Sequence, residues 1–581
     1  MNKANAALVG LGALLLMAAL SLNNQSLTTQ KLQVQSGMVA PISLCGSPGA
    51  RSILKLMDTT KQMAPLMTNL GNHAMPINTD IERAQLFFNQ GINLYYGFNH
   101  LEAYRSFREV ARLDPGSAMA YWGQALSLGP NINLPMDPAD TEVVYIAVQK
   151  ARELAPRAGE KEKMLIDAIS TRYSKEALED RKPLDQAYAN SMAEVAKKFP
   201  DDPDIQTLYA ESLMDLHPWD YWKDGNPQPW THEIIELLQR VIRKNPNHPG
   251  ANHLHIHIVE ASSNPGAATA SADLLRDLVP GAGHLVHMPS HIYIRTGRYL
   301  EGVMANEKAV AMDMEYINQC NVQGVYPLFY FPHNYHFLWA CAMMAGQAEK
   351  SLSTARELAK TIPVELMNVK DFVTLQHWYA VPMYTMVRFG KWESILKEPQ
   401  PADSLLYVKS VWHYARGMAF VRTKKLDLAS TELNHLKEIV ARPIMQELTI
   451  SGFNSFEKVL SIGVNVLEGE IELVRGNAPN AIEKLKEAVA IESSLLYQEP
   501  PDWYHPSRQT LGAILLDAKK PAEAQQAFEQ DLAIYPSNGW SLFGLHQSLV
   551  MQNKKSEAAK IKKEFEQAFA KADVKLTSSR K

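Results

Sequence analysis

Residues 87–115 decide the fold, and they read FFNQGINLYYGFNHLEAYRSFREVARLDP. Small residues stand at Gly91 and Ala103, where they allow two helices to approach closely. Phe107 is expected to fill the groove between these helices, and Pro115 to end the second one, since proline cannot continue a helix. The stretch therefore predicts two antiparallel helices joined by a short turn.

Similar units recur along the chain, and prolines mark their frame. Pro246 and Pro280 lie 34 positions apart, which is the length of one such helix pair. Residues 297–299 and 390–392 are typical of turns between paired helices. The best carboxyl-terminal copy contains Leu511, Gly512, Ala524, Phe528 and Pro536, and a further copy opens at Trp540 and Gly544. Repetition of this kind predicts a stacked helical-repeat architecture.

Over roughly residues 80 to 570 the chain resembles the tetratricopeptide-repeat (TPR) family. The resemblance implies an all-α, right-handed α-solenoid of antiparallel helix pairs, and a family mostly known for binding peptides along a concave groove. The strings at residues 97–100 (GFNH), 283–291 (GHLVHMPSH) and 332–336 (PHNYH) resemble a group of long bacterial repeat proteins with no assigned reaction. No catalytic residues therefore carry over.

The domain organisation follows from this pattern. The predicted segments are a signal peptide or anchor (1–25), a poorly defined amino-terminal segment (26–80), amino-terminal repeats (81–200), central repeats with a histidine-rich concave site (201–365), carboxyl-terminal repeats (366–570) and a tail (571–581). Two aromatic-rich insertions, about Trp219–Trp230 and Asp313–Phe331, depart from the minimal repeat. Because insertions in a solenoid gather on one face, they are expected to cover the binding surface.

Composition excludes several classes of protein. The 581 residues are 46% hydrophobic and 21% charged, as in ordinary folded chains. The formal net charge of −4 shows no basic excess, so nucleic acid is not an expected partner. Three cysteines exclude a disulfide scaffold.

The amino terminus has the order of a secretory signal. Lys3 precedes an apolar run over residues 6–22, which a polar stretch follows. An uncleaved anchor is the alternative, and it would be the chain's only contact with a membrane. The pattern predicts an exported protein, periplasmic or secreted.

Histidines make the sequence specific, because eight of the 18 fall between residues 253 and 336. His253 lies seven positions after Pro246, and His287 lies seven positions after Pro280. His336 holds the equivalent position in its repeat, here called the same slot, when the extra residues of the second insertion are not counted. His257 and His291 lie eleven positions after the same prolines, and so form i, i+4 pairs with the first two. Equivalent slots on neighbouring first helices are expected to face one another across about 8–10 Å.

This register predicts a transition-metal site, since imidazole is the commonest nitrogen ligand. The predicted ligands are His253, His257, His287, His291, His336 and Glu211. Further ligands, or hydrogen-bond partners of ligands, are His284, His333 and Glu260, and Arg295 and His377 are expected to line the same groove. Such a donor set is compatible with Cu, Zn, Fe or Mn. The pattern does not indicate whether the chain is an enzyme.

Two other interpretations stay open. Arg295 and Arg298 favour a groove for a peptide or an anion, in an exported scaffold that binds a protein partner or an assembly partner. Alternatively, the histidines are ordinary hydrogen-bonded structural residues, as expected for His255, which points to another helix face. The sequence contains no Gly-rich phosphate loop, no nucleophile elbow and no Cys-x-x-Cys pair.

Overall fold

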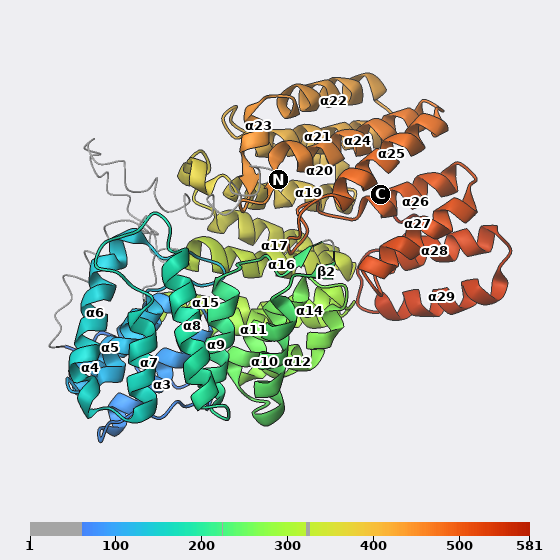
Figure 1. The fold of residues 1–581 in the computed structure, drawn as a ribbon. Helices are drawn as coiled ribbons and strands as arrows, with labels where there is room; N and C mark the ends of the chain where they lie inside the picture. The colour runs from blue at the N-terminus through green and yellow to red at the C-terminus, as the bar shows by residue number, and fades with distance from the viewer. Residues whose placement is uncertain (1–60, 224, 321–325) are drawn as a thin grey trace. The chain divides into compact units, whose positions relative to one another are not determined.

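A computed structural model of the chain describes residues 61–223, 225–320 and 326–581 (Figure 1). The predicted signal or anchor at residues 1–25 lies outside the described residues. The described chain divides into two compact units. Unit 1 runs to Ile292 and includes Glu307–Phe331, and unit 2 comprises Tyr293–Asn306 and Pro332–Lys581.

Unit 1 is built from successive helices. They are α3 (Glu82–Tyr96), α4 (His100–Leu113), α5 (Ala118–Ser127), α6 (Thr141–Leu154), α7 (Glu160–Ser170), α8 (Lys182–Lys198), α9 (Pro203–Asp215), α10 (Thr231–Lys244), α11 (Pro249–Glu260), α12 (Thr269–Leu278) and α13 (Gly283–His287). Short 3-10 turns lie at η2 (Pro138–Asp140), η3 (Ala155–Arg157) and η4 (Pro265–Ala268), and a π-helical turn at η5 (Tyr326–Tyr330). Helices α14 (Pro289–Arg295) and α15 (Tyr299–Cys320) each contribute residues to both units.

Unit 2 continues the series. Its helices are α16 (Phe331–Met344), α17 (Ala348–Thr361), α18 (Leu375–Tyr379), α19 (Val381–Arg388), α20 (Trp392–Lys397), α21 (Leu406–Arg422), α22 (Leu426–Val440), α23 (Ile444–Glu447), α24 (Phe456–Val474), α25 (Ala478–Ser493), α26 (Ser507–Asp517), α27 (Pro521–Ile534), α28 (Gly539–Met551) and α29 (Lys555–Ala568). The 3-10 turns η6 (Val364–Leu366) and η7 (Lys370–Phe372) lie between α17 and α18.

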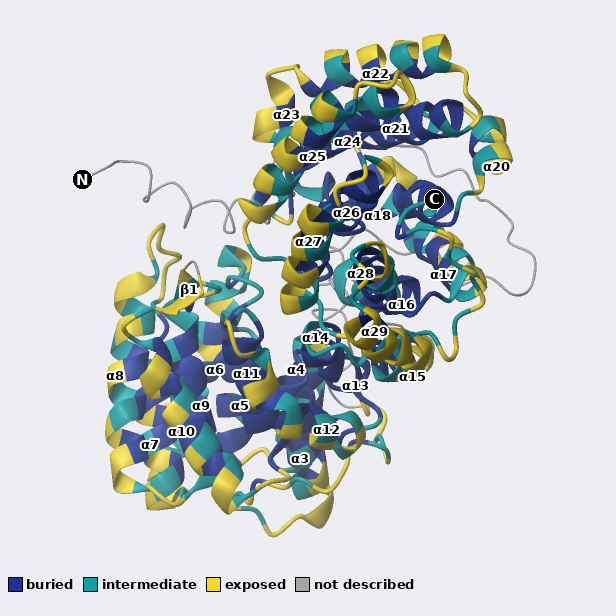
Figure 2. Cartoon of the chain, turned by 90° about the vertical axis from the view of Figure 1, so that its right-hand side faces the viewer, coloured by how far each residue is buried: buried dark blue, intermediate teal, exposed yellow. Residues whose placement is uncertain are grey.

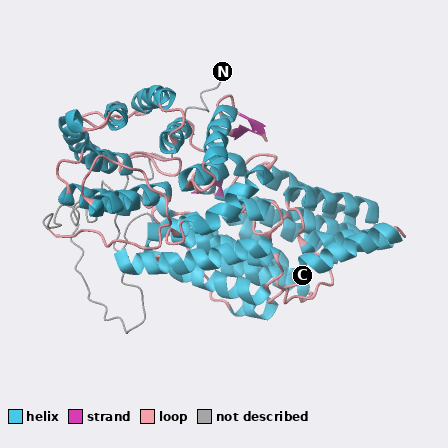
Figure 3. Ribbon diagram, turned by 90° about the horizontal axis from the view of Figure 1, so that it is seen from below, coloured by secondary structure: helices cyan, strands magenta, loops and turns pink. Residues whose placement is uncertain are grey.

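Strands are minor in the described part of the chain (Figure 3). One antiparallel pair joins β1 (Trp222–Lys223) to β2 (Asn226–Pro227), and the other joins β3 (Thr449–Ile450) to β4 (Asn454–Ser455). Among the helices of the described residues, none combines the length and the apolar character that crossing a membrane requires. The predicted all-α class of antiparallel helix pairs is confirmed.

The packing of the repeat matches its sequence motif. Phe107 on α4 is fully buried, and its ring occupies the space that a Cβ atom would need at Gly91 on α3 and at Gly123 on α5. Phe528 on α27 stands in the same relation to Gly512 and to Gly544. One aromatic ring among three helices, with glycine on both flanking helices, is therefore the packing unit in both parts of the chain.

The two helices of a pair differ in burial, and the histidines are on the buried one. Helix α10 has one apolar stripe, and its other faces are polar and largely exposed. Every residue of α11, in contrast, is buried, and this helix appears dark in Figure 2. The polar side chains of α11 must consequently find their partners inside unit 1.

Candidate metal centre

Five imidazoles gather in unit 1, on α11, α13 and α14. They belong to His253, His257, His284, His287 and His291, and each of these residues is between 0 and 5% exposed. Successive ring centroids lie 4.8 to 6.1 Å apart. We call these five residues the histidine centre.

The local sequence explains why these rings lie on the same helix face or close to one another. His253 and His257 are one turn apart on α11, so they share a face. Pro289 begins α14 directly after α13, and it lacks the amide hydrogen that would continue the helical ladder. Across this junction the Nε2 atoms of His287 and His291 lie 3.0 Å apart.

Three of the rings are oriented through their Nδ1 atoms. His253 Nδ1 lies 2.6 Å from the carbonyl oxygen of Tyr96. His257 Nδ1 lies 3.0 Å from Oε1 of Glu260, and His291 Nδ1 lies 2.5 Å from Oε2 of the same carboxylate. Where Nδ1–H donates to a carbonyl or carboxylate oxygen, as in His253 and His257, Nε2 carries the lone pair that a metal requires.

Glu260 is a buried carboxylate held between two imidazoles. Burial alone would raise its pKa, but the charges and hydrogen bonds of His291 and His257 outweigh burial and hold the pKa at about 2. The carboxylate is therefore ionised at neutral pH, in a site from which water is largely excluded. A cation bound by the neighbouring imidazoles would compensate this charge.

Burial disfavours the charged form of three of these imidazoles. Burial lowers the pKa of His253 and of His284, and the neighbouring histidines lower both further. Burial also lowers the pKa of His257, although Glu260 opposes the shift. Neutral imidazole is the form that ligates a metal.

One arrangement of donor atoms is already close to that of a metal site. His253, His257 and His284 each offer a ring nitrogen within 4.8 Å of the other two. The Nε2 atoms of His253 and His284 are 3.2 Å apart. Nε2 of His257 is buried and has no hydrogen-bond partner. A buried acceptor without a partner costs about 1–3 kcal/mol, a cost that a bound ion would remove.

Aromatic side chains cover the histidine centre. The ring of Phe98 lies 4.5 Å from that of His253, and Trp219 meets His257 edge-on at 5.4 Å. Tyr330 contacts His284 at 4.9 Å. Trp219 and Tyr330 come from the two aromatic insertions, so both insertions contribute to the cover, as the sequence predicts.

Two of these aromatic residues have an unusual backbone. Phe98 has a φ of 56° and Trp219 a φ of 60°, in the left-handed region that bulky residues rarely adopt. Within the described residues they are the only aromatic side chains with a positive φ. Such conformations cost of order 1–3 kcal/mol each and cluster at functional sites. Both lie against the same centre.

A second group of possible ligands is linked by hydrogen bonds to a single carboxylate oxygen. Asp204 Oδ1 accepts from His73 (2.9 Å), His248 (3.2 Å) and the hydroxyl of Tyr96 (2.8 Å). His248 Nδ1 accepts the amide hydrogen of Ala251, so its Nε2 carries the proton. This group therefore braces Tyr96, whose carbonyl orients His253, and both ring nitrogens of His248 are engaged.

Glu211, predicted as a ligand, lies in a different polar cluster of unit 1. The charges that act on its carboxyl are those of Asp215 and Arg172, and Arg172 donates to Asp215 at 2.6 Å. The structure thus gathers four of the six predicted ligands, His253, His257, His287 and His291, together with His284 and Glu260.

The remaining predicted residues belong to unit 2. The ring of His336 stands edge-on to that of His377 at 5.4 Å, so these two slots are neighbours as the repeat frame predicts. His333 contacts the ring of Phe337. Arg295 lies 3.8 Å from Glu499, within the same unit.

We expect replacement of Glu211 by glutamine to stabilise the protein at high pH. Burial raises the pKa of Glu211, and Asp215 raises it further. Below the unfolded pKa both states are protonated, so the carboxyl has no effect there. As the pH rises, the unfolded state ionises first and stability falls. The variant should gain more than about 1 kcal/mol at pH 8 and nothing near pH 4, measured by urea denaturation. An equal gain at both pH values would contradict this explanation.

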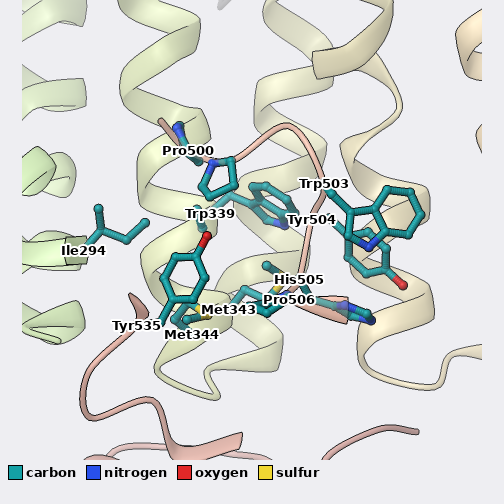
Figure 4. A pocket seen from close by; sticks show the side chains of 12 residues that line it. Ile294, Trp339, Met343, Met344, Pro500, Trp503, Tyr504, His505, Pro506 and Tyr535 are labelled. Carbon is teal, nitrogen blue, oxygen red and sulfur yellow. The ribbon is translucent and has the colours of Figure 1, made fainter. Parts of the chain in front are cut away.

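Unit 2 contains a small pocket of different chemistry (Figure 4). Its walls are mainly aromatic rings, prolines and methionines, with Trp339, Trp503 and Tyr504 prominent. Burial lowers the pKa of His505, which also lines it. One imidazole among apolar walls does not form a metal site, so the histidine centre of unit 1 is the stronger candidate.

Sequence reasoning missed two residues of the centre. Tyr96 supplies a backbone oxygen, which no side-chain pattern reveals. Phe98 falls in the GFNH string that the sequence already singles out, so that string was the available signal.

No protein-family model matches the chain, and no curated protein matches its sequence. Three solved structures are similar to it at low TM-scores. The human IFIT1 dimer with m7Gppp-AAAA is 12% identical, with a TM-score of 0.30 over 85% of this chain and 91% of that chain. Yeast Tom70 is 12% identical, with a TM-score of 0.27 over 83% and 92%. The APC/C hetero-tetramer Cut9–Hcn1 is 12% identical, with a TM-score of 0.27 over 84% and 76%.

The helix pairs and their packing define the class, which is an all-α protein built from antiparallel helix pairs. Its function is inferred from the histidine centre.

Proposed function

We propose that this chain is an exported helical-repeat protein that binds a transition-metal ion in the histidine centre. The observation that carries the proposal is the orientation of three buried rings. Nδ1 of His253, His257 and His291 each lies beside an oxygen, and Nε2 of His253 and of His291 lies within hydrogen-bond distance of a further imidazole. Structural histidines need no such common orientation.

The donor set favours copper, zinc or iron over manganese among the four metals that the sequence allows. The converging atoms are imidazole nitrogens, and the one nearby carboxylate is engaged by two ring N–H groups. Imidazole suits Cu, Zn and Fe, whereas Mn prefers carboxylate and water. No cysteine belongs to the centre, so a closed zinc-finger type of site is not supported.

A metal-dependent reaction is consistent with this arrangement. Three imidazoles around one ion leave an open position, as in catalytic zinc sites, where the ion lowers the pKa of a bound water. Phe98, Trp219 and Tyr330 would exclude bulk water from that position. The strained backbone of Phe98 and Trp219 supports a functional use of the site.

Export rests on the amino-terminal pattern alone, and it places the protein in a periplasm or outside the cell. The resemblance of GFNH, GHLVHMPSH and PHNYH to a group of long bacterial repeat proteins fits this setting. The second candidate function is an interaction scaffold for a protein or peptide, which the helical-repeat fold favours. A scaffold should keep its partner, and bind no metal, when the histidines are replaced.

Metal binding by the full-length chain tests the proposal. Protein stripped with a chelator should bind Zn(II) or Cu(II) tightly, and His257→Gln should weaken binding by at least about 100-fold. His255→Gln is the matched control, because His255 lies on the same helix but bonds to Ser271 Oγ at 2.9 Å instead. A stripped wild-type protein that binds neither ion would refute the proposal.

A further inference from the structure

We infer that the histidine centre holds two metal ions, an inference that rests on the proposed metal-binding function. His253, His257 and His284 form the first position, and His287 and His291 form the second. Glu260 orients one ligand of each position.

The separations between ring nitrogens match those of two bound ions. A metal–imidazole bond of about 2.0–2.1 Å puts two nitrogens on one ion about 3.3 Å apart at the tetrahedral angle, and about 2.9 Å apart at a right angle. The Nε2 atoms of His253 and His284 are 3.2 Å apart. Those of His287 and His291 are 3.0 Å apart. Each pair forms an N–H···N hydrogen bond in this structure, at a separation that also matches one edge of a coordination polyhedron.

The two edges share no residue, and one ion does not use all the donors. Five imidazoles exceed the four ligands of a tetrahedral ion, and a catalytic ion takes only three from the protein. The first position is complete without the second, since His253, His257 and His284 already offer three nitrogens within 4.8 Å of one another.

Glu260 explains how the two positions are coupled. One of its oxygens faces His257 of the first position, and the other faces His291 of the second. Because both ring N–H groups meet one carboxylate, the Nε2 lone pairs of both rings are set by a single side chain. Loss of this carboxylate should therefore affect both ions, whereas loss of ligands in one position should affect one.

Native mass spectrometry of the chelator-stripped full-length chain, titrated with Zn(II), tests the inference. Wild-type protein is expected to bind two ions per chain. The double variants His253→Gln/His284→Gln and His287→Gln/His291→Gln should each bind one, and His255→Gln should still bind two. Circular dichroism checks that every variant keeps its helix content.

The outcomes separate the inference from the proposed function. Wild-type protein that saturates with one Zn(II) overturns the two-ion inference and leaves the proposed function intact. Binding of no ion overturns both. If a double variant fails to fold, Cu(II)-loaded wild-type protein decides: magnetic coupling or dipolar broadening in the EPR spectrum supports two adjacent ions, and the spectrum of isolated Cu(II) contradicts them.

Discussion

Replacement of Glu260 by alanine is expected to lower the affinity for Zn(II) by a factor of about 10²–10⁴. The carboxylate contacts His257 through a hydrogen bond and His291 through an ion pair, and loss of one such partner typically costs 10–100-fold in metal affinity. The metal-free protein should also lose stability. Two buried ring N–H groups would be left without acceptors, at about 1–3 kcal/mol each.

The variant Glu260→Gln tests the charge of this side chain and the tautomer of the facing imidazole, because it leaves the side-chain volume unchanged. Glutamine fills the same space, but its amide nitrogen donates a hydrogen bond where the carboxylate accepted one. The facing imidazole must then accept at Nδ1 and carry its proton on Nε2, where the proton blocks the metal. We expect this variant to bind Zn(II) at least about 10-fold more weakly than wild type, with nearly normal stability when metal-free.

Competition against a chromophoric chelator measures the affinities, and urea denaturation with and without Zn(II) measures the stabilities. Glu236→Gln, on the exposed face of the neighbouring helix α10, is the control and should change neither. Unchanged Zn(II) affinity in both Glu260 variants would show that the carboxylate does not orient ligands.

Replacement of Phe107 by alanine is expected to destabilise the protein by about 3–5 kcal/mol. The ring is fully buried, and it fills the space left by Gly91 and by Gly123 on the two flanking helices. Because the glycines have no side chains, neither of them can fill the resulting cavity. Phe→Ala in such a core loses both the transfer free energy of the ring and the contacts around it.

Urea denaturation followed by circular dichroism measures this loss. Leu101→Ala is the matched control, because Leu101 is on the same helix and 40% exposed. It should change stability by less than about 0.5 kcal/mol. A similar decrease in the free energy of unfolding in both variants would contradict the proposed role of Phe107 in packing the three helices.

Much of the centre could be predicted from local spacing. The i, i+4 rule puts His253 and His257 on one face, and the repeat frame puts His287 and His291 in the matching slots. Glu260, one turn beyond His257, follows from the same helical period. His255, predicted to pack between helices, indeed bonds to Ser271 of the next helix, α12.

Glu211 shows where that reasoning stops. It holds the same slot as His257 by its distance from a proline, yet its carboxyl lies beside Asp215 and Arg172. The distance of a residue from the proline of its repeat determines the helix face on which its side chain lies. It does not determine which neighbour the side chain contacts, because this depends on the tilt of each helix and on nearby charges.

The amino-acid sequence by itself determined the all-α class, the glycine–phenylalanine packing of the repeats and the faces of the helices that carry histidine, because helical periodicity is a property of neighbouring residues. The tertiary structure alone showed that Nδ1 of His253 is a donor. His253 is oriented by the backbone of Tyr96, which is 157 positions away, and is covered by Phe98. Hydrogen-bond direction and burial arise from long-range packing, which the spacing of residues along one helix does not contain.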